Sequence, residues 1–252
     1  MRMRQERTAT DHRTNCLLAA LEPEDFAYLE PHLEGVILAK GTILYETDET
    51  IRYIYFPHDI IVSLVDVMED GGSAEMTVFG CEAVIGLISA VVTRESVGRY
   101  IVQVPGTASR IATDKMHEAI STRPKLRRLI LHYTEALIAQ LVHTVACNAV
   151  HSVEARCCRW ILSSHDRLDG DTLPLTHEFL AEVIGVQRST VSTVMGALHK
   201  RGLIQQGRGG ITVTDRTGLE GAACECYGKI RRRFERLLPH TFTKGFPERE
   251  QS

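Results

Sequence analysis

Apolar residues recur at helical spacing on both sides of Gly185 within residues 175–202. Positions three or four residues apart share one face of a helix, so the pattern predicts two short helices that each bury one face. The apolar positions are Leu180, Val183 and Ile184 before the glycine, and Val191, Val194 and Leu198 after it. Glycine suits a turn that other residues enter only with strain. Two helices joined in this way form a helix-turn-helix.

The second predicted helix carries polar residues that we expect on its outward face. They are Gln187, Arg188, Ser189, Thr190, Ser192 and Thr193. Hydrogen-bonding side chains at the start of such a helix suit entry into the major groove of DNA, where base edges present donors and acceptors. A helical hairpin without DNA contact is the alternative. Thr176 is the expected N-cap of the first helix and a further candidate DNA contact.

A β-hairpin is predicted directly after these two helices. Leu203 and Ile204 begin a strand, residues 207–210 read Gly-Arg-Gly-Gly, and residues 211–214 form the returning strand. A hairpin in this place is a wing. Arg208 in the wing and Lys200 at the end of the second helix are candidate phosphate contacts, because basic side chains release counterions when they meet DNA.

Strand-like runs replace the helical period between residues 35 and 113. The runs are rich in β-branched and aromatic residues, and turn signals such as Asp70-Gly71-Gly72 separate them. Several short strands at this spacing indicate a jelly roll or sandwich. Two short helices are predicted before the sheet, one over residues 16–21 and one opened by Pro23.

A long helix is predicted after the sheet, and one apolar stripe runs along it. The stripe comprises Leu126, Ile130, Tyr133, Leu137, Leu141 and Val145. Spacings near three and four are typical of a coiled-coil seam, so these residues are the candidate dimer interface. A helix that lies on its own domain is the alternative. The length of the helix and its wide apolar surface favour the dimer.

These elements predict an α+β chain with three parts and a tail. Residues 1–122 form a β jelly roll with N-terminal helices, similar to a cyclic-nucleotide-binding domain. Residues 123–150 form the dimerisation helix, and residues 151–238 form a winged helix-turn-helix domain. Ser152 is the expected N-cap of the first helix of that domain, and its last helix is expected from about Gly218 to Leu238. Residues 239–252 form a flexible tail.

Composition narrows the class of protein only modestly. The chain has 252 residues, of which 44% are hydrophobic and 24% charged, and this is ordinary for a globular protein. A formal net charge of −3 leaves room for DNA binding, because the distribution of charge matters more than its total. The sequence contains neither an uninterrupted run of 18 apolar residues nor an apolar secretory signal at its start. We therefore expect a cytoplasmic protein without membrane contact.

Seven cysteines are expected to be free thiols in a reducing cytosol. Neither Cys157-Cys158 nor Cys224-x-Cys226 has the two-residue gap of a zinc knuckle, so no metal site is predicted. Cys147 is a candidate redox residue, because it lies near the end of the predicted dimer helix and could meet its own copy across a two-fold axis.

The order of the three parts resembles the Crp–Fnr family of bacterial transcription regulators over about residues 20–230. The resemblance rests on residues 84–88 (VIGLI) in the roll, on residues 151–162 (HSVEARCCRWIL) and on residues 175–204, which include the helix-turn-helix. The family implies a homodimer whose roll senses a signal. That signal rotates the paired helix-turn-helix motifs into register with DNA.

Departures from the family indicate which signals are absent. Members that bind cyclic AMP carry glycine-glutamate in the roll and then an arginine that neutralises the phosphate. Here Leu87 follows Gly86, and Ser96 occupies the place of the arginine. Oxygen-sensing members hold an iron–sulfur cluster with several N-terminal cysteines, whereas this chain has only Cys16 there. His58 alone does not indicate haem. No cofactor is expected.

The sequence therefore predicts a transcription regulator without enzyme activity that binds double-stranded DNA as a homodimer on a pseudo-palindrome, independently of cyclic AMP. RNA polymerase is a further candidate partner. Arg188 is the candidate guanine contact, through its planar fork of donors. Well-known relatives carry glutamate at the place of Ser189 and a second arginine at that of Thr193, which implies a different half-site here. The alternative is a ligand- or redox-sensing module whose main output is protein contact.

Overall fold

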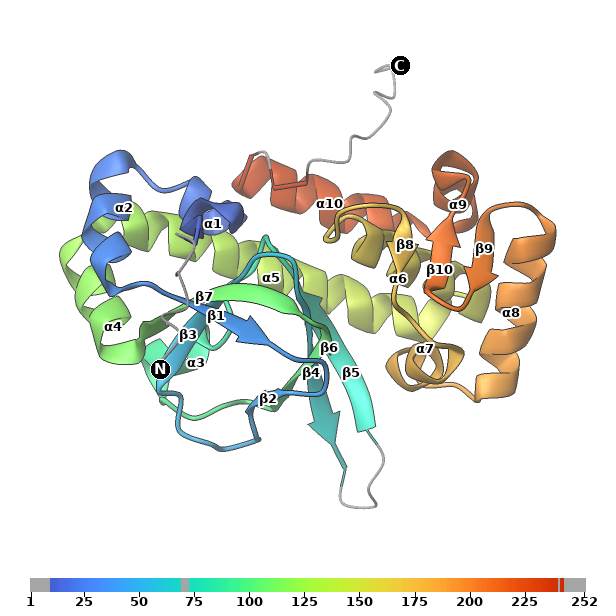
Figure 1. Cartoon of the computed structure of the whole chain (residues 1–252), viewed down its shortest axis with the longest axis horizontal. Helices are drawn as coiled ribbons and strands as arrows, with labels where there is room; N and C mark the ends of the chain where they lie inside the picture. Colours follow the sequence, from blue (N-terminus) through green and yellow to red (C-terminus); the bar gives the residue numbers. More distant parts are fainter. Residues whose placement is uncertain (1–9, 69–72, 240, 243–252) are drawn as a thin grey trace, which may run out of the picture.

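The computed structural model describes residues 10–68, 73–239 and 241–242, arranged as an N-terminal roll, a long helix and a C-terminal domain (Figure 1). Within these residues the roll contains seven strands. They are β1 (Glu34–Leu38), β2 (Ile43–Tyr45), β3 (Tyr53–Pro57), β4 (Ile61–Val67), β5 (Ser73–Phe79), β6 (Arg99–Val104) and β7 (Gly106–Ala112). One antiparallel sheet has the order β1-β7-β3 and the other the order β2-β6-β4-β5.

Burial along the strands explains why they form two packed sheets. In β6, Tyr100, Val102 and Val104 are buried and the residues between them are half-exposed, which is the alternation of a sheet with one covered face. The first five residues of β4 are all buried. Val62 of this strand faces the core of the roll, whereas Ile61 belongs to the core of the C-terminal domain. Strand β4 therefore lies between two hydrophobic cores.

Short helices complete the N-terminal part. They are α1 (Cys16–Ala19), α2 (Pro23–Leu29), α3 (Leu87–Val92) and α4 (Thr113–Thr122), together with the 3₁₀ turns η1 (His12–Thr14) and η2 (Glu30–His32). Pro23 begins α2 as predicted, because its missing N–H is not needed in the first turn. Leu17, Leu18 and Leu29 are fully buried, so α1 and α2 close one side of the roll.

The predicted long helix is α5 (Pro124–Val150), and its apolar stripe does not lie where we expected it. Of the candidate dimer residues, Leu126, Ile130, Tyr133 and Leu137 are buried against the roll inside the same chain. Leu141 packs beside them, half-buried, and only Val145 is exposed. The prediction is wrong for the four buried residues. The spacing of apolar residues shows that a helix face is buried, but it does not show whether the chain's own roll or a partner covers that face.

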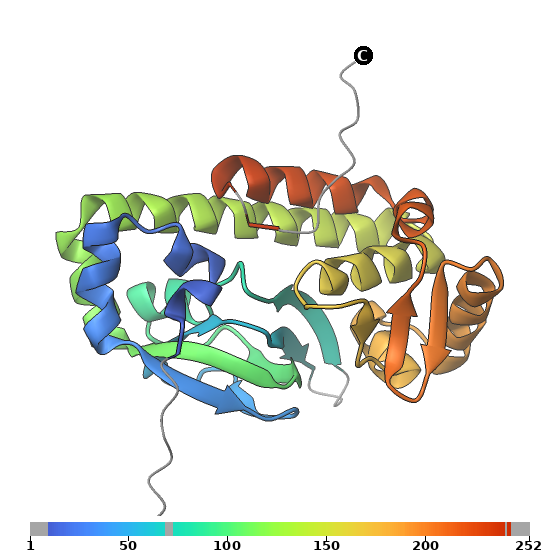
Figure 2. The ribbon, with the colours of Figure 1, turned by 45° about the horizontal axis from the view of Figure 1, so that its top comes forward.

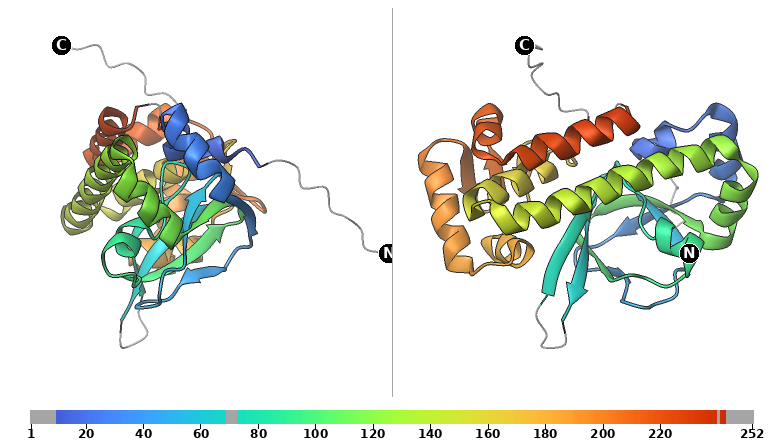
Figure 3. Two further views of the ribbon diagram at one scale, coloured as in Figure 1. Left: turned by 90° about the vertical axis from the view of Figure 1, so that its left-hand side faces the viewer. Right: turned by 180° about the vertical axis from the view of Figure 1, so that it is seen from behind.

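No other element of the described chain covers the side of α5 that faces the viewer in Figure 3 (right). Helix α5 also carries exposed apolar side chains on a second face. The exposed apolar residues are Leu131, Ile138, Val142 and Val145, and Glu135 and Ala149 fall on the same face. Successive positions from 131 to 149 differ by four, three, four, three and four residues, which is the spacing of a heptad seam. We call these six residues the exposed seam.

The 27 residues of α5 are long and apolar enough to cross a membrane, judged by length and composition alone. Long core helices of soluble proteins also meet these two criteria, so length and composition alone do not indicate a membrane span. One face of α5 packs on the roll and another on the C-terminal helix α10 (Glu225–Leu237), which runs alongside it (Figure 2). A helix covered on two faces by its own chain resembles a packed helix more than a membrane span.

The C-terminal domain contains the predicted winged helix-turn-helix. Its elements are α6 (Val153–His165), β8 (Thr172–Leu173), α7 (His177–Ile184), α8 (Arg188–Lys200), β9 (Ile204–Gly207), β10 (Gly210–Val213), α9 (Arg216–Ala222) and α10. Ser152 caps α6 as predicted, since its side chain accepts from the N–H of Ala155 at 3.3 Å. Strand β8 is not among the elements that the sequence pattern predicts. It pairs with β10 and extends the wing to three strands.

The last predicted helix is instead two helices, α9 and α10. Ala223 and Cys224 between them are extended, with ψ angles of 157° and 159°. The break lets α10 change direction and bury Tyr227, Ile230 and Phe234. Glycines at 218 and 221 lower the helix propensity of this segment. The burial of the apolar residues of α10 therefore determines where the helix breaks. In the predicted tail, Thr241 and Phe242 are buried, and the rest of the tail beyond Pro239 lies outside the described residues.

Roll and C-terminal domain share an apolar contact. Ile61, Val78 and Val104 of the roll join the buried cluster that contains Trp160 of α6. The indole of Trp160 donates to Glu75 Oε1 of β5 at 2.9 Å. Burial raises the pKa of Glu75 to about 7, although hydrogen bonds from Ser63 and Trp160 act in the opposite direction.

An ion pair buried at the same boundary links the two parts by charge. Arg167 Nη2 lies 2.7 Å from Glu82 Oε1, and the two side chains are 3% and 1% exposed. A Cβ at Gly80 would lie 2.7 Å from the Arg167 side chain, so glycine is required there for the arginine to enter. Charges taken this far out of water are tolerated only in pairs.

We predict that Glu82→Ala lowers the free energy of unfolding by about 3–5 kcal/mol, because Arg167 would keep its buried charge without a partner. Urea titration followed by tryptophan fluorescence measures this, since Trp160 lies at the boundary. The control is Lys115→Ala, which removes a pair with Glu118 whose side chains are 48% and 50% exposed and should cost less than about 1 kcal/mol. Equal effects in the two variants would contradict the prediction.

Candidate DNA-binding surface

The turn between α7 and α8 fixes the angle of the helix-turn-helix. The hydroxyl of Thr176 accepts from the N–H of Phe179 at 3.1 Å and caps α7, as predicted. Gly185 ends α7 in the left-handed region, with φ of 70°. Open space surrounds this glycine, so its conformation, rather than crowding, disfavours other residues.

Helix α8 buries one face and presents the other to solvent. Val191, Met195 and Leu198 are fully buried in the domain core. Val194, expected among them, is only half-buried, because Met195 takes the central position. All candidate contact residues are exposed: Thr176, Gln187, Arg188, Ser189, Thr190, Ser192, Thr193, Lys200 and Arg208. They come from the start of α7, from α8 and from the wing.

Two of the candidate side chains already make contacts within the domain. Arg188 Nη1 lies 3.6 Å from Glu178 Oε1 in the first turn of α7, and both side chains are mostly exposed. Exposed pairs of this kind are weak, so Arg188 can exchange Glu178 for another acceptor. The hydroxyl of Thr193 donates to the carbonyl of Ser189 at 3.0 Å, within α8.

His177 connects all three parts of the surface, and the sequence analysis missed it. Its Nδ1 lies 3.0 Å from Ser192 Oγ on α8, and its Nε2 lies 2.7 Å from Gln206 Oε1 in the wing. Gln206 in turn donates to the carbonyl of Met195 at 3.2 Å. A histidine at the first position of a helix gives no signal of such contacts in sequence, because they depend on how three elements meet.

The first turn of α8 is open to an anion. Gln187, at the N-cap, makes no side-chain capping hydrogen bond, in contrast to Thr176 on α7. Uncapped backbone N–H groups at a helix start attract phosphate. A groove between wing and α7, lined by residues 174–177 and 206–211, includes Arg208 at the tip of the hairpin.

Several other basic residues form ion pairs with acidic residues of the same chain. Arg201 Nη1 lies 2.6 Å from Glu154 Oε1, which ties the end of α8 to α6. On α10, Arg231 is buried and lies 3.2 Å from Asp166, which also pairs with Arg216 at 2.6 Å. Residues 229–233 of α10 carry one lysine and three arginines, and this basic run includes a core residue. A run of charges in sequence does not reveal such burial.

Cys147 does not lie on the exposed face of α5. It is 0% exposed, and its Sγ lies 3.4 Å from that of Cys224 in the same chain. A meeting with its own copy across a two-fold axis is therefore excluded in this arrangement. Burial raises the pKa of Cys224, and that of Cys226 to about 12, which disfavours the reactive thiolates of a redox switch. Cys157 and Cys158 are buried in the core of the C-terminal domain.

Aromatic rings pack against one another in the interior of the roll. Tyr45 lies 6.1 Å from Tyr55 and 6.3 Å from Tyr100 between ring centroids, and Phe79 lies 5.7 Å from Tyr100. Ser96 is buried, and its hydroxyl donates to the carbonyl of Gly98 at 2.7 Å.

His58 is bound within the roll. Its Nε2 lies 2.8 Å from Ser109 Oγ, and its Nδ1 lies 3.3 Å from the hydroxyl of Thr107. Burial lowers the pKa of His58, so the ring favours its neutral form. With both nitrogens facing hydroxyls, the imidazole has a structural role in the sheet.

Comparison with known proteins agrees with the geometry of the C-terminal domain. The family described as the Crp-like helix-turn-helix domain matches residues 155–222, which extend from α6 to α9. None of the curated proteins matches the chain.

Solved structures with similar folds are transcription regulators of one family. A Crp/Fnr-family regulator from Eubacterium rectale is 14% identical, with a TM-score of 0.63 over 83% of this chain and 98% of that one. FixK2 from Bradyrhizobium japonicum is 17% identical, with a TM-score of 0.65, and the match covers 76% of this chain and 98% of FixK2. A CRP-family regulator from Thermus thermophilus is 20% identical, with a TM-score of 0.61, and the match covers 76% of this chain and 99% of that regulator. At these identities the likeness shows the fold.

The family match and the fold agree with the exposed, polar start of α8. The chain therefore carries a Crp-like helix-turn-helix DNA-binding domain on the fold of the Crp/Fnr transcription regulators.

Proposed function

We propose that this Crp/Fnr-type regulator binds a pseudo-palindromic DNA site as a homodimer and does so without cyclic AMP. The observation that carries the proposal is the first half of α8, where polar side chains are exposed around an N-terminus without a side-chain cap. This helix would enter the major groove, and its start would face the bases.

Roles can be assigned from the chemistry of each side chain. Arg188 is the base-reading residue, because its planar guanidinium matches the two acceptors of guanine. Gln187, Ser189 and Ser192 lie beside it and can bond to neighbouring bases or phosphates. The remaining contacts, which position the domain on the DNA backbone, are Thr176, Thr190, Thr193, Lys200 and Arg208.

The exposed seam of α5 is the proposed dimer interface. Its heptad spacing suits packing against an identical helix, and Val142 at its centre is 60% exposed in the single chain. Arg233 of α10 lies 3.3 Å from Glu135, and the groove between the two helices is lined by Ile138, Val142 and charged residues of α10. Two-fold pairing through α5 would hold two α8 helices about 34 Å apart, one turn of DNA.

Independence from cyclic AMP follows from the interior of the roll. A cyclic phosphate needs a positive partner when it is buried, but Ser96 occupies the place of the arginine in nucleotide-binding relatives and is committed to Gly98. Arg94, which is near in sequence, pairs with Asp114 at 2.7 Å. Tyr45, Tyr55 and Tyr100 pack edge to face inside the roll.

The setting that fits these properties is the cytoplasm, with double-stranded DNA and a second copy of the chain as partners. RNA polymerase is a further partner if the protein activates transcription. We assign the protein no catalytic reaction and no membrane contact.

Selection of binding sites from a random duplex pool tests the proposal. With reduced protein and no added nucleotide, we expect an enriched palindrome whose half-sites lie about one helical turn apart. Added cyclic AMP should leave the enrichment unchanged. Enrichment only with cyclic AMP would contradict independence. If no duplex is enriched or retarded at low salt, the main output is protein contact and the proposal fails.

We predict that Arg188→Ala weakens binding to the selected site by about 1–3 kcal/mol and relaxes the preference at one base position. Quantitative gel retardation on the site and its single-base variants measures both effects. Arg52→Ala, which removes an exposed arginine from the roll, is the matched control and should change neither. An equal loss on every sequence would mean that Arg188 contacts only phosphate.

We predict that Val142→Glu raises the dimer dissociation constant by at least about 100-fold, because two unpaired carboxylates would be buried in the seam. Light scattering across a concentration series measures the oligomeric state. Lys125→Glu makes a charge change elsewhere on the exposed surface of α5 and should leave the dimer intact. A Val142→Glu protein that remains dimeric at low concentration would show that the interface lies elsewhere.

A further inference from the structure

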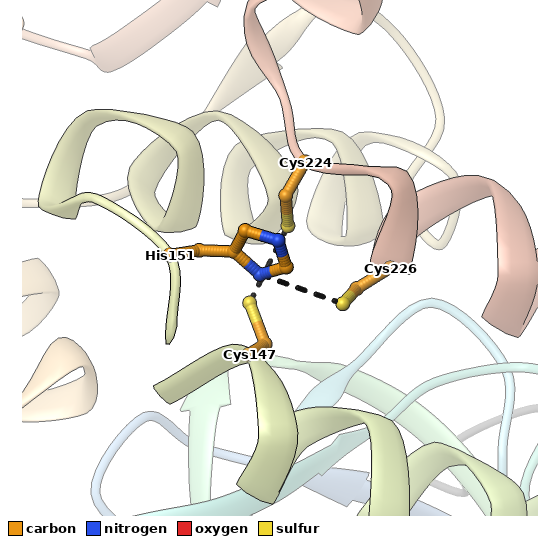
Figure 4. A group of neighbouring side chains, drawn as sticks. All are labelled: Cys147, His151, Cys224 and Cys226. Atoms are coloured by element: carbon orange, nitrogen blue, oxygen red, sulfur yellow. Dashed lines mark hydrogen bonds between the residues drawn. The ribbon is translucent and has the colours of Figure 1, made fainter. Parts of the chain in front are cut away.

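Four potential metal ligands meet where the long helix joins the C-terminal domain (Figure 4). They are Cys147, His151, Cys224 and Cys226. Cys147 lies in the last turn of α5, and the N–H of His151 donates to the carbonyl of Cys147 at 3.1 Å, which places the imidazole one turn beyond the thiol. Cys224 is the N-cap of α10 and Cys226 lies in its first turn. The break between α9 and α10 is what brings this pair to α5.

From this geometry we infer a binding site for a zinc-class divalent cation, with three sulfur ligands and one nitrogen. One ligand atom from each residue lies within 4.8 Å of all the others. Sγ of Cys147 and Cys224 are 3.4 Å apart, and Sγ of Cys226 lies 3.7 Å from Nδ1 of His151. A tetrahedral zinc ion, with Zn–S bonds near 2.3 Å, would separate its sulfur ligands by about 3.8 Å.

The surroundings of His151 match those of a histidine ligand. Its Nδ1 faces Cys226, while its Nε2 lies 3.1 Å from Oε2 of Glu225. Metal-binding histidines commonly donate their second N–H to a carboxylate, which fixes the tautomer and orients the ring. Here that contact leaves the Nδ1 atom on the side of Cys226 and available as a ligand.

Charge around the cluster also suits a cation with thiolate ligands. Cys224 and Cys226 lie at the start of α10, where the positive end of the helix dipole stabilises negative sulfur. Cys147 lies at the negative end of α5, so its thiolate depends on the cation itself. Three thiolates around a divalent ion leave one net negative charge. The guanidinium of Arg159 is close enough to Cys224 to interact with it, and its Nε is buried without a hydrogen-bond partner.

A disulfide between Cys147 and Cys224 is the competing explanation. It would use two of the four groups and would give no role to Cys226 or to the ordered pair of His151 and Glu225. A single cation uses all of them at once. All three cysteines are also buried, and Ala155 packs against them.

The position of the cluster gives the cation a structural task. His151 lies between α5 and α6, at the point where the DNA-binding domain leaves the long helix. Helix α10, the last helix of that domain, packs against both α5 and α6. A bound ion would hold the start of α10 to the end of α5. It would thereby fix the angle at which α8 meets DNA, a consequence that rests on the proposed function, whereas the metal site itself does not.

Metal analysis of the full-length chain, purified under reducing conditions from zinc-supplied cells, tests the inference. We expect about one zinc ion per chain in the wild type and at least about a tenfold loss in Cys224→Ala and Cys226→Ala. Cys157→Ala is the matched control, because it removes a buried cysteine from the neighbouring core. This control should retain the metal. Wild-type protein without metal, or equal loss in the control, would overturn the site.

Cobalt titration of the metal-free wild type avoids any dependence on variants that fold poorly. Co²⁺ should produce the intense visible absorption of tetrahedral thiolate coordination, and zinc should abolish it. Glu225→Gln leaves all four ligands in place and should weaken metal affinity by about 10–100-fold without changing the shape of the spectrum. An octahedral spectrum, or a Cys147–Cys224 disulfide in protein that takes up no metal, would overturn the inference.

Duplex binding after chelation separates the two claims. If the wild type holds zinc and loses DNA affinity when it is removed, both the site and its task are supported. If zinc is held but DNA affinity is unchanged, the site stands and the fixing of α8 is wrong. Failure to bind DNA in the zinc-loaded protein would contradict the proposed function alone.

Discussion

Helix α5 has more apolar surface than one partner can cover, and the rest of the structure follows from how that surface is divided. One face buries Leu126, Tyr133 and Leu137 in the roll, and a second receives α10. A third keeps the exposed seam. Exposed apolar stripes of this length are costly in water, so an identical helix is the simplest partner that removes the cost and also supplies two-fold symmetry. The proposed dimer and its paired α8 helices thus depend on a single amphipathic element.

Polar contacts at the boundary between roll and C-terminal domain limit how the two parts can move. The pair of Arg167 and Glu82 is shielded from water, and the contact of Trp160 with Glu75 is partly buried. Buried charges lose more by separation than exposed charges, so this boundary behaves as a specific contact. In this arrangement the roll contacts α6 through Trp160 and α7 through β5, and both helices pack against α8.

The cysteine cluster would act on the same geometry from the other end of α6. His151 of the cluster precedes α6, whereas Arg167 of the ion pair follows it. A cation held by α5 and α10 would oppose rotation of the domain about His151. With a bound cation, two separate contacts, one ionic and one metal-based, would favour a single orientation of α8 relative to the helix that carries the proposed dimer seam.

Local patterns in the sequence determined the elements and the order of the parts. Thr176, Ser152 and Gly185 act as predicted because caps and left-handed turns depend on neighbours within a few residues. The spacing of apolar and polar residues likewise predicted the outward face of α8. Only the tertiary structure decided which face of α5 stays exposed, why Arg231 is buried, and how His177 joins the wing to α8. It alone brought together Cys147 and Cys224, 77 residues apart, because contacts between distant segments depend on packing rather than on local spacing.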